Sequence, residues 1–538
     1  MQSLARRDGD GARRHAHDLA GAGAGRRRAR RARHAGGARR RARRRHRRRP
    51  PAARRGPAGE SPRDVLGRLP ARRAPRRGRA LRRSVSAARR EPRGAAAPAR
   101  VLAAHVLERV ETDAAFADLA LEAGAARHRV APRDVGLATE LVYGTLRWQR
   151  YLDWILAPHS RRRLDALDAR VRVLLRMTAY QLVFLERVPA FAAVNDAVTL
   201  ARSGARGAAE YTNAVLRAFA KRGAREREPA PPRDPTDALA TRCSFPTWLA
   251  ARWVTRYGAA EAEALMRAMN ERPPLTLRAN TLRLSREALA ARLAAEDDVA
   301  TRPTSWAPEG LVTERASGAP AGWRAFADGA CVVQDEASML VARLLEPRAG
   351  ETIIDACAAP GTKTTHLAQL MEGRGRIVAL DPQPARLGRV TEASARLGVT
   401  IVQTIEGTAQ ELASSYAPRA DALLVDAPCT SLGVLRRNPE VKWRRRPEDI
   451  AASAARQREI LTAAATLVKP GGRLVYATCS PEPEENEAVV TALLTAQPAW
   501  RLDPPADFPL SLDADGYLRT RPDRHGIDGF TAVRLRRA

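Results

Sequence analysis

Buried strands alternate with helices from about residue 326 onward, and this alternation constrains the fold more than any other feature of the chain. The segment 351–370 (ETIIDACAAPGTKTTHLAQL) contains a buried strand, a turn of small residues and the start of a helix. A second strand, RIVALD, follows at 376–381. Strands and helices in alternation are typical of a parallel sheet with helices on both faces. We therefore predict a doubly wound α/β domain over residues 326–538.

The strong positive charge of the chain lies mainly in its first hundred residues. The formal net charge is +34, but residues 1–100 hold 34 of the 93 basic and 6 of the 59 acidic residues, so they carry +28 and the remainder +6. Residues 1–96 have almost no aromatic or β-branched side chains, and they cannot bury enough apolar area to offset the entropy of ordering. We predict a disordered tail, which could be an RNA-binding arm or an organelle-targeting segment. We favour a third interpretation, a start codon assigned too early in a GC-rich reading frame.

Cysteine usage and hydropathy place the protein among soluble proteins of a reducing compartment. The cysteines at 243, 331, 357, 429 and 479 form no CxxC pair and no metal-ligand spacing, so we predict no metal site. An odd number of cysteines in a long chain argues against a secreted disulfide scaffold. No segment approaches the run of about 18 apolar residues that a membrane helix needs. We expect a cytoplasmic monomer that does not contact membranes.

Residues 97–225 show helical periodicity and no strand pattern, which predicts an all-α domain. The expected helices are Arg100–Val110, Val135–Leu156, Leu167–Glu186, Phe191–Arg202 and Glu210–Arg222. A proline-rich linker follows at 226–235 (EREPAPPRDP). A small α+β segment is then expected over 240–325, with the motifs RCSFPTWLAARW at 242–253 and NERPPLTLRANTLR at 270–283.

The turn at 357–363 has the composition of a nucleotide-binding loop. Small residues between a strand and a helix N-terminus let the backbone approach a nucleotide closely. The turn lacks the pattern GxGxxG, which disfavours a dinucleotide. Asp381 ends the second strand, 26 residues after Asp355, where an acid normally accepts hydrogen bonds from ribose hydroxyls. The alternative is an acid that merely ends a strand.

Two cysteines follow strands of the predicted sheet. Cys429 ends the motif DAPC at 426–429, and Cys479 lies in YATCS at 476–480. Reactive groups in such a sheet gather beyond the carboxyl ends of the strands, and both thiols can face one pocket if the two strands are neighbours. A single cysteine is usually a small core residue, but two that each end a strand in a distinctive loop favour a catalytic pair.

These motifs together resemble those of the RNA 5-methylcytosine methyltransferases. The resemblance runs from about residue 97 to the C-terminus and includes CAAPGTK at 357–363 and HGIDGF at 525–530. In the helical region, LVYGTLR at 141–147 and TNAVLR at 212–217 resemble a NusB-like domain. The combination resembles the ribosomal RNA small-subunit methyltransferase B type. It implies an all-α NusB-like RNA-binding domain, a small RNA-positioning subdomain and a Rossmann-like S-adenosylmethionine methyltransferase domain.

The resemblance also implies roles for individual residues. S-adenosyl-L-methionine would be held by Cys357, Ala358, Ala359, Pro360, Gly361, Thr362, Lys363, Asp381, Glu406 and Asp426. Glu406 stands where the family usually has Asp, and Thr362 replaces a usual Gly. Cys479 would be the nucleophile, Cys429 would assist product release, and Asp426 would also bind the cytosine. Arg436, Arg437, Lys442 and Trp443 would contact the RNA.

The implied chemistry explains why a cysteine is needed. Cytosine C5 is a poor nucleophile until a thiolate adds to C6, and a hydroxyl is too weakly acidic for this role. A free thiol is only a few per cent ionised at neutral pH, and we expect the helix after Cys479 to lower its pKa. The predicted function is methylation of cytosine C5 in 16S ribosomal RNA. Alternatives are a cytosine of transfer RNA or large-subunit rRNA, a non-catalytic NusB-like RNA-binding factor and, more distantly, a nucleotide-dependent oxidoreductase.

Overall fold

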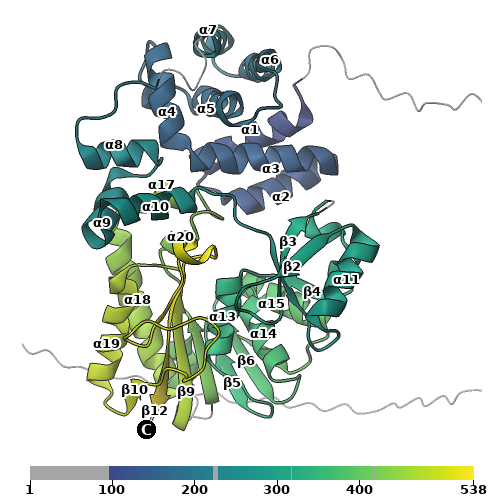
Figure 1. Ribbon diagram of the computed structural model, residues 1–538, viewed down its shortest axis with the longest axis vertical. Helices are drawn as coiled ribbons and strands as arrows, with labels where there is room; N and C mark the ends of the chain where they lie inside the picture. Colours follow the sequence, from purple (N-terminus) through teal and green to yellow (C-terminus); the bar gives the residue numbers. More distant parts are fainter. Residues whose placement is uncertain (1–95, 222–227, 317, 416–419) are drawn as a thin grey trace, which may run out of the picture. The chain divides into compact units, whose positions relative to one another are not determined.

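The computed structural model describes residues 96–221, 228–316, 318–415 and 420–538 (Figure 1). The predicted tail therefore lies outside the described residues except for Ala96, and so does the beginning of the predicted linker. Across the described ranges, none of the helices combines the length and the apolar character needed to cross a membrane.

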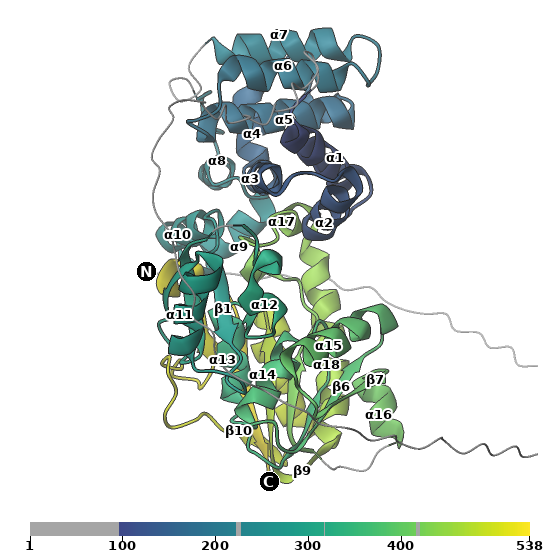
Figure 2. The same ribbon diagram turned by 90° about the vertical axis from the view of Figure 1, so that its right-hand side faces the viewer.

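The N-terminal region contains helices and no strands among its described residues, as its periodicity predicts. Its elements are α1 (Pro98–Thr112), α2 (Ala117–His128), α3 (Pro132–Arg147), α4 (Gln149–Leu156), η1 (Ala157–His159), η2 (Leu164–Ala166), α5 (Ala169–Phe184), α6 (Ala190–Ala201) and α7 (Ala208–Ala220). Pro98 and Pro132 occupy first turns of helices, where a missing N–H is tolerated. Figures 1 and 2 both show α6 and α7 alongside α5.

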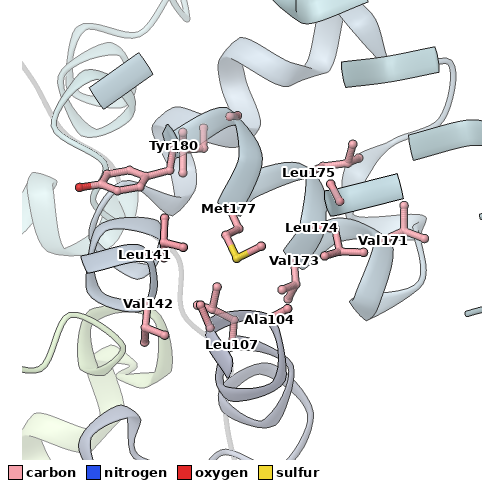
Figure 3. Close-up of a cluster of buried hydrophobic side chains, with 14 of the residues drawn as sticks. Ala104, Leu107, Leu141, Val142, Val171, Val173, Leu174, Leu175, Met177 and Tyr180 are labelled. Carbon is pink, nitrogen blue, oxygen red and sulfur yellow. The ribbon is translucent and has the colours of Figure 1, made fainter. Parts of the chain in front are cut away.

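The core of this region surrounds α5. Leu174 and Met177 of α5 are fully buried and pack with Leu107 of α1 and Leu141 of α3 (Figure 3). The single helix predicted over 135–156 is instead two helices, because the backbone at Trp148 leaves α-helical geometry. Helix α2 was not predicted. Its buried face consists largely of alanine and glycine, which give little hydrophobic contrast.

Three helices and a small sheet follow the linker. The helices are α8 (Pro235–Arg242), α9 (Thr247–Tyr257) and α10 (Ala259–Met269). The antiparallel sheet has the order β2-β3-β1-β4, with β1 (Thr276–Ala279), β2 (Ala300–Pro303), β3 (Gly310–Arg315) and β4 (Cys331–Val333). Helix α11 (Arg286–Asp297) packs on this sheet, and η3 (Pro320–Gly322) and α12 (Arg324–Ala327) precede β4. Strand β4 lies beyond the boundary predicted at residue 325.

The C-terminal region is the predicted doubly wound α/β domain. Within the described residues its sheet has the order β10-β12-β9-β8-β5-β6-β7, and β11 pairs with β12. The strands are β5 (Thr352–Asp355), β6 (Arg376–Asp381), β7 (Val402–Glu406), β8 (Ala420–Asp426), β9 (Val468–Thr478), β10 (Trp500–Leu502), β11 (Leu518–Arg519) and β12 (Thr531–Arg537). Strands β5 to β9 pair in parallel, whereas β12 pairs antiparallel with both β9 and β10. The sequence did not predict this antiparallel edge.

Alternate residues of the central strands pack against helices on opposite faces of the sheet. Ile353 and Leu424 share a buried cluster with α13 and α14, whereas Ile354 and Leu423 share one with α16, α18 and α19. The helices of this domain are α13 (Glu336–Leu344), α14 (Thr362–Leu370), α15 (Pro384–Leu397), α16 (Ala409–Ser415), α17 (Val441–Arg444), α18 (Pro447–Thr466), α19 (Glu487–Ala496) and α20 (Pro522–His525). The short turns are η4 (Leu432–Val434) and η5 (Pro483–Glu485). Because β8 lies between β5 and β9, the ends of these strands meet at one edge.

Candidate active site

A cavity of about 700 Å³ lies at the carboxyl ends of the parallel strands. It brings together most of the residues that the sequence motifs predicted. The predicted residues that line it are Cys357, Ala359, Pro360, Thr362, Lys363, Asp381, Asp426, Cys429, Arg437 and Cys479. Glu406 is exposed at the end of β7, beside Asp381 in the strand register, and is not among the lining residues.

The turn between β5 and α14 is shaped by Gly361. Its φ of +100° lies in the left-handed region, and a Cβ there would stand 3.0 Å from the Cα of Val390. A side chain at this position would therefore be strained and crowded. Thr362 begins α14 and lines the cavity, so the structure accommodates a β-branched residue where the resemblance led us to expect glycine. The turn brings its backbone and the first amides of α14 to the cavity, as a nucleotide-containing cofactor requires.

Asp381 presents a fixed carboxylate at the end of β6. The side chain is almost fully buried, and its Oδ1 accepts a hydrogen bond from the amide of Gln383 at 3.0 Å. Arg386 Nη1 lies 3.4 Å from Oδ2. A buried acid beside a tight turn fits the ribose-binding role that the sequence indicates. The residues at this end of the cavity therefore fit the nucleoside part of the implied cofactor.

The two cysteines meet in the cavity, as predicted from the ends of their strands. Strands β8 and β9 are parallel neighbours, with Asp426 paired to Ala477, and the Sγ atoms of Cys429 and Cys479 lie 3.2 Å apart. The hydrogen bond between them, together with burial, raises the pKa of Cys429 well above its ordinary value. The same hydrogen bond lowers the pKa of Cys479. The two shifts favour Cys479 as the thiol that ionises more readily.

The cause of the lowered pKa differs from the expected one. We expected a helix directly after Cys479, but α19 begins only at Glu487, after the short turn η5. The main cause is the hydrogen bond from Cys429, supported by the hydroxyl of Ser431 and the charge of Lys363. The hydrogen bond with Cys429 thus takes the place of the helix terminus as the main cause of the lowered pKa of Cys479.

Asp426 lies between the cysteines and the cofactor turn. Its Oδ2 accepts a hydrogen bond from Lys363 Nζ at 2.6 Å, and its side chain is 28% exposed. The Lys363 ammonium also lies 5.0 Å from the ring centroid of Phe530. Because Asp426 lines the cavity, its carboxylate can accept a hydrogen bond from the amino group of a pyrimidine bound there.

Only one of the four expected RNA contacts lines the cavity. Arg437 does so, bonded to Asp528 and, at 2.7 Å, to Asp335. Arg436 is buried and pairs with the same two acids. The sequence motifs did not predict these acids as site residues, although HGIDGF at 525–530 contains Asp528.

The other two residues expected to contact RNA, Lys442 and Trp443, instead donate hydrogen bonds to backbone carbonyls of α3. Lys442 is buried, and its Nζ donates to the carbonyl of Arg147 at 2.8 Å and to Asn270 Oδ1 at 2.9 Å. Trp443 Nε1 donates to the carbonyl of Leu146 at 2.6 Å. Buried side chains with partners inside the protein do not present themselves to a ligand, so we assign no RNA contact to Arg436 or Lys442.

Three models of known families match successive parts of the chain. One described as 16S rRNA methyltransferase RsmB/F matches residues 342–536, and the NusB family matches residues 97–221. A ferredoxin-like domain of RsmF/B-like methyltransferases matches residues 245–318. Their order agrees with the helical region, the small sheet and the α/β domain of the structure.

Individual relatives extend over most of the chain. The probable ribosomal RNA small subunit methyltransferase B of Bacillus subtilis is 35% identical over 451 residues, which is 81% of this chain and 98% of the relative. The crystal structure of PH0851 is 29% identical with a TM-score of 0.71, covering 82% of this chain and 99% of that one. The crystal structure of NSun6 from Pyrococcus horikoshii with SFG, an analogue of S-adenosylmethionine, is 27% identical with a TM-score of 0.50. That match covers 55% of this chain and 98% of that one.

Proposed function

The chain belongs to the 16S rRNA methyltransferase RsmB/F family, and from this premise we propose that it methylates C5 of a cytosine in 16S ribosomal RNA. Its cofactor is S-adenosylmethionine, which when bound supplies an electrophilic methyl group. The observation that carries the proposal is the pair of thiols, Cys429 and Cys479, 3.2 Å apart in the cavity that also contains Asp381. A fold for binding alone does not need two thiols that share a proton at such a site.

The cofactor is assigned to the turn at 357–363 and to Asp381. Gly361 lets the turn backbone reach the cavity, and Asp381 presents a carboxylate to ribose hydroxyls. Glu406 lies beside Asp381 in the register of β6 and β7. We keep it as an outer contact to the adenine side, because it is exposed and does not line the cavity.

In the proposed reaction, Cys479 is the nucleophile. Its thiolate forms a bond from sulfur to cytosine C6, and the π electrons of the C5–C6 bond move to C5, which becomes nucleophilic. C5 would take the methyl group from bound S-adenosylmethionine, and the electron pair of the broken methyl–sulfur bond would stay with the neutral thioether that leaves. Asp426 accepts a hydrogen bond from the exocyclic amino group and so holds the base while the adduct forms. The target base must leave its stack to enter the cavity.

Product release requires elimination from the methylated adduct. The C5 proton departs to solvent, and the electrons of the C5–H bond restore the C5–C6 double bond. The C6–S bond breaks, and its electron pair returns to the sulfur of Cys479. The thiol of Cys429, 3.2 Å away, donates to that sulfur as the negative charge develops on it.

Single cysteine variants test this division of roles. With a labelled 16S rRNA transcript and S-adenosylmethionine, Cys479→Ala should form no methylated product and no covalent complex. Cys429→Ala should methylate once and then stall, which leaves protein attached to RNA as a retarded band on a denaturing gel. Cys331→Ala is the matched control, because this thiol is buried in the small sheet, and it should behave as wild type.

Other outcomes would contradict the assignment. A retarded band with Cys479→Ala and none with Cys429→Ala would reverse the two roles. Full activity without a band in both variants would show that neither thiol is the nucleophile. Transcripts of transfer RNA and large-subunit rRNA, tested in parallel, decide between the alternative substrates, and bisulfite sequencing of rRNA from a deletion strain locates the methylated base. Cytoplasmic location and a monomeric state remain predictions.

A further inference from the structure

One buried carboxylate, that of Glu485, connects the two loops that carry the cysteines. Its Oε1 accepts hydrogen bonds from the amide of Thr430 at 2.8 Å and from Gln457 Nε2 at 3.0 Å. Its Oε2 accepts hydrogen bonds from the hydroxyls of Thr430 and Ser480. Thr430 directly follows Cys429 and Ser480 directly follows Cys479, so a single side chain restrains the neighbour of each thiol.

The restraint extends to the other side of Cys429. Gln457, from α18, is fully buried and donates to the carbonyl of Pro428 at 3.0 Å as well as to Glu485. The hydroxyl of Tyr476 donates to the backbone carbonyl of Glu485 at 2.6 Å. The backbone before and after Cys429 is thus tied to the same cluster, which is itself fixed to β9 and α18.

The charge of Glu485 acts unequally on the two thiols. Cys429 has a raised pKa, mainly because of its hydrogen bond to Cys479 and its burial, and the negative charge of Glu485 raises it further. The main influences on Cys479 come instead from Cys429, burial, Asp426, Ser431 and Lys363.

Other ionisable and charged groups also surround the pair. Asp426 and Lys363 face it from the cavity side, and Tyr476 faces it from β9. Arg445 donates to the carbonyl of Thr430. Of the acids, Glu485 affects Cys429 and Asp426 affects Cys479, so their charges oppose a thiolate on different members of the pair.

We propose that Glu485 is a positioning residue, which locks the two cysteine loops together and keeps the shared proton on Cys429. The proposal rests on the roles given above to the two thiols. Glu485 acts through the residues next to them, because among the described residues no hydrogen bond joins its carboxylate to either sulfur. Loss of its charge should therefore make Cys429 a competing thiolate without removing either cysteine.

The variant Glu485→Gln removes the negative charge of the side chain but nearly keeps its size and shape. Glutamine keeps an acceptor for the Thr430 amide and Gln457, and the hydroxyls of Thr430 and Ser480 can rotate to accept from its amide nitrogen. The matched control is Glu482→Gln. Glu482 is also fully buried in the same motif, but its carboxylate accepts from Arg252 and Trp253 of α9 instead of from the cysteine loops.

Alkylation of the full chain measures which thiol reacts first. The proteins are pulsed with iodoacetamide between pH 6 and pH 9, and peptide mass spectrometry locates the modification in singly alkylated protein. Wild type and Glu482→Gln should react first at Cys479, over the same pH range as each other. Glu485→Gln should raise the proportion modified at Cys429, relative to Cys479, by at least about tenfold, which corresponds to roughly 1.4 kcal/mol.

The assay uses neither RNA nor cofactor, so its result stands apart from that of the trapping experiment. A folded Glu485→Gln protein with a Cys429-to-Cys479 ratio within about twofold of wild type would overturn the proposal. If this variant fails to fold, Glu485→Asp tests the placement of the carboxylate instead, because it keeps the charge but withdraws the carboxylate from both loops. Its ratio should lie above that of wild type, and an unchanged ratio in a folded protein would equally refute the positioning role.

Discussion

Replacing Asp381 by asparagine tests the cofactor site with little disturbance of the fold. Asp381 ends β6 and is 2% exposed, and its Oδ1 accepts the Gln383 amide at 3.0 Å. Asparagine can keep that hydrogen bond through its own oxygen. It places an amide nitrogen at the position of Oδ2, where a ribose hydroxyl needs an acceptor.

The size of the effect follows from the charge of the lost acceptor. A hydrogen bond to a charged group contributes about 1.5–3 kcal/mol. At about 1.4 kcal/mol per factor of ten in affinity, the Kd for S-adenosylmethionine should rise roughly 10- to 150-fold in Asp381→Asn. The melting temperature should stay near that of wild type, because the bond that holds the strand end is retained.

Calorimetric titration of the full chain with S-adenosylmethionine measures this change. Asp421→Asn is the control, since Asp421 lies at the opposite end of β8 and pairs with Lys469 away from the cavity. The control should bind the cofactor as wild type does. An unchanged Kd in folded Asp381→Asn would refute the assignment of Asp381 to the ribose.

Three further predictions concern the stability of the fold. In Gly433→Ala the new Cβ would stand 2.1 Å from the carbonyl oxygen of Gly529, so the melting curve should show a loss of about 1–3 kcal/mol, with RNA methylation reduced more than cofactor binding. Burial raises the pKa of Asp355 to about 7, so the folded state holds a proton that the unfolded state releases between pH of about 4 and 7, and wild-type stability falls as pH rises through this window. The melting temperature of Asp355→Asn, relative to that of wild type, should therefore be higher at pH 8 than at pH 5. The same difference in melting temperature at both pH values would contradict the raised pKa of Asp355. Leu174→Ala should lower the free energy of unfolding of the helical region by about 2–5 kcal/mol in denaturant titrations, because Leu174 is fully buried.

The meeting of the two cysteines at the sheet edge could be predicted because short motifs fix both residue types and positions. Cys429 and Cys479 lie 50 residues apart, yet each follows a recognisable buried strand, and parallel neighbours bring such ends together. The strand 376–381 was predicted with the bounds that the structure has. The sequence did not show that the strands before Cys429 and Cys479 are neighbours. The structure shows this, because β8 pairs with β9.

The predicted RNA contacts of Arg436 and Lys442 were wrong for one physical reason: both side chains make tertiary contacts that no local sequence pattern encodes. Arg436 and Lys442 belong to a run of charged residues, and a charge run ordinarily indicates a solvated surface. Here Asp335 and Asp528 neutralise Arg436, and Phe245 stacks near the Lys442 ammonium. Their partners come from distant parts of the chain, so the sequence alone could not show that these cations are buried.

The contact between the sulfurs of Cys429 and Cys479 also predicts that the protein is sensitive to peroxides. The sulfurs lie 3.2 Å apart, and the pKa of Cys479 is lowered. When Cys479 is a thiolate and Cys429 a thiol, hydrogen peroxide can accept two electrons from the pair and leave a disulfide, water and hydroxide. The strands β8 and β9 already hold the sulfurs together, so this oxidation needs little rearrangement of the sheet. If the proposed reaction is correct, methylation should then stop in an intact protein and resume on treatment with dithiothreitol.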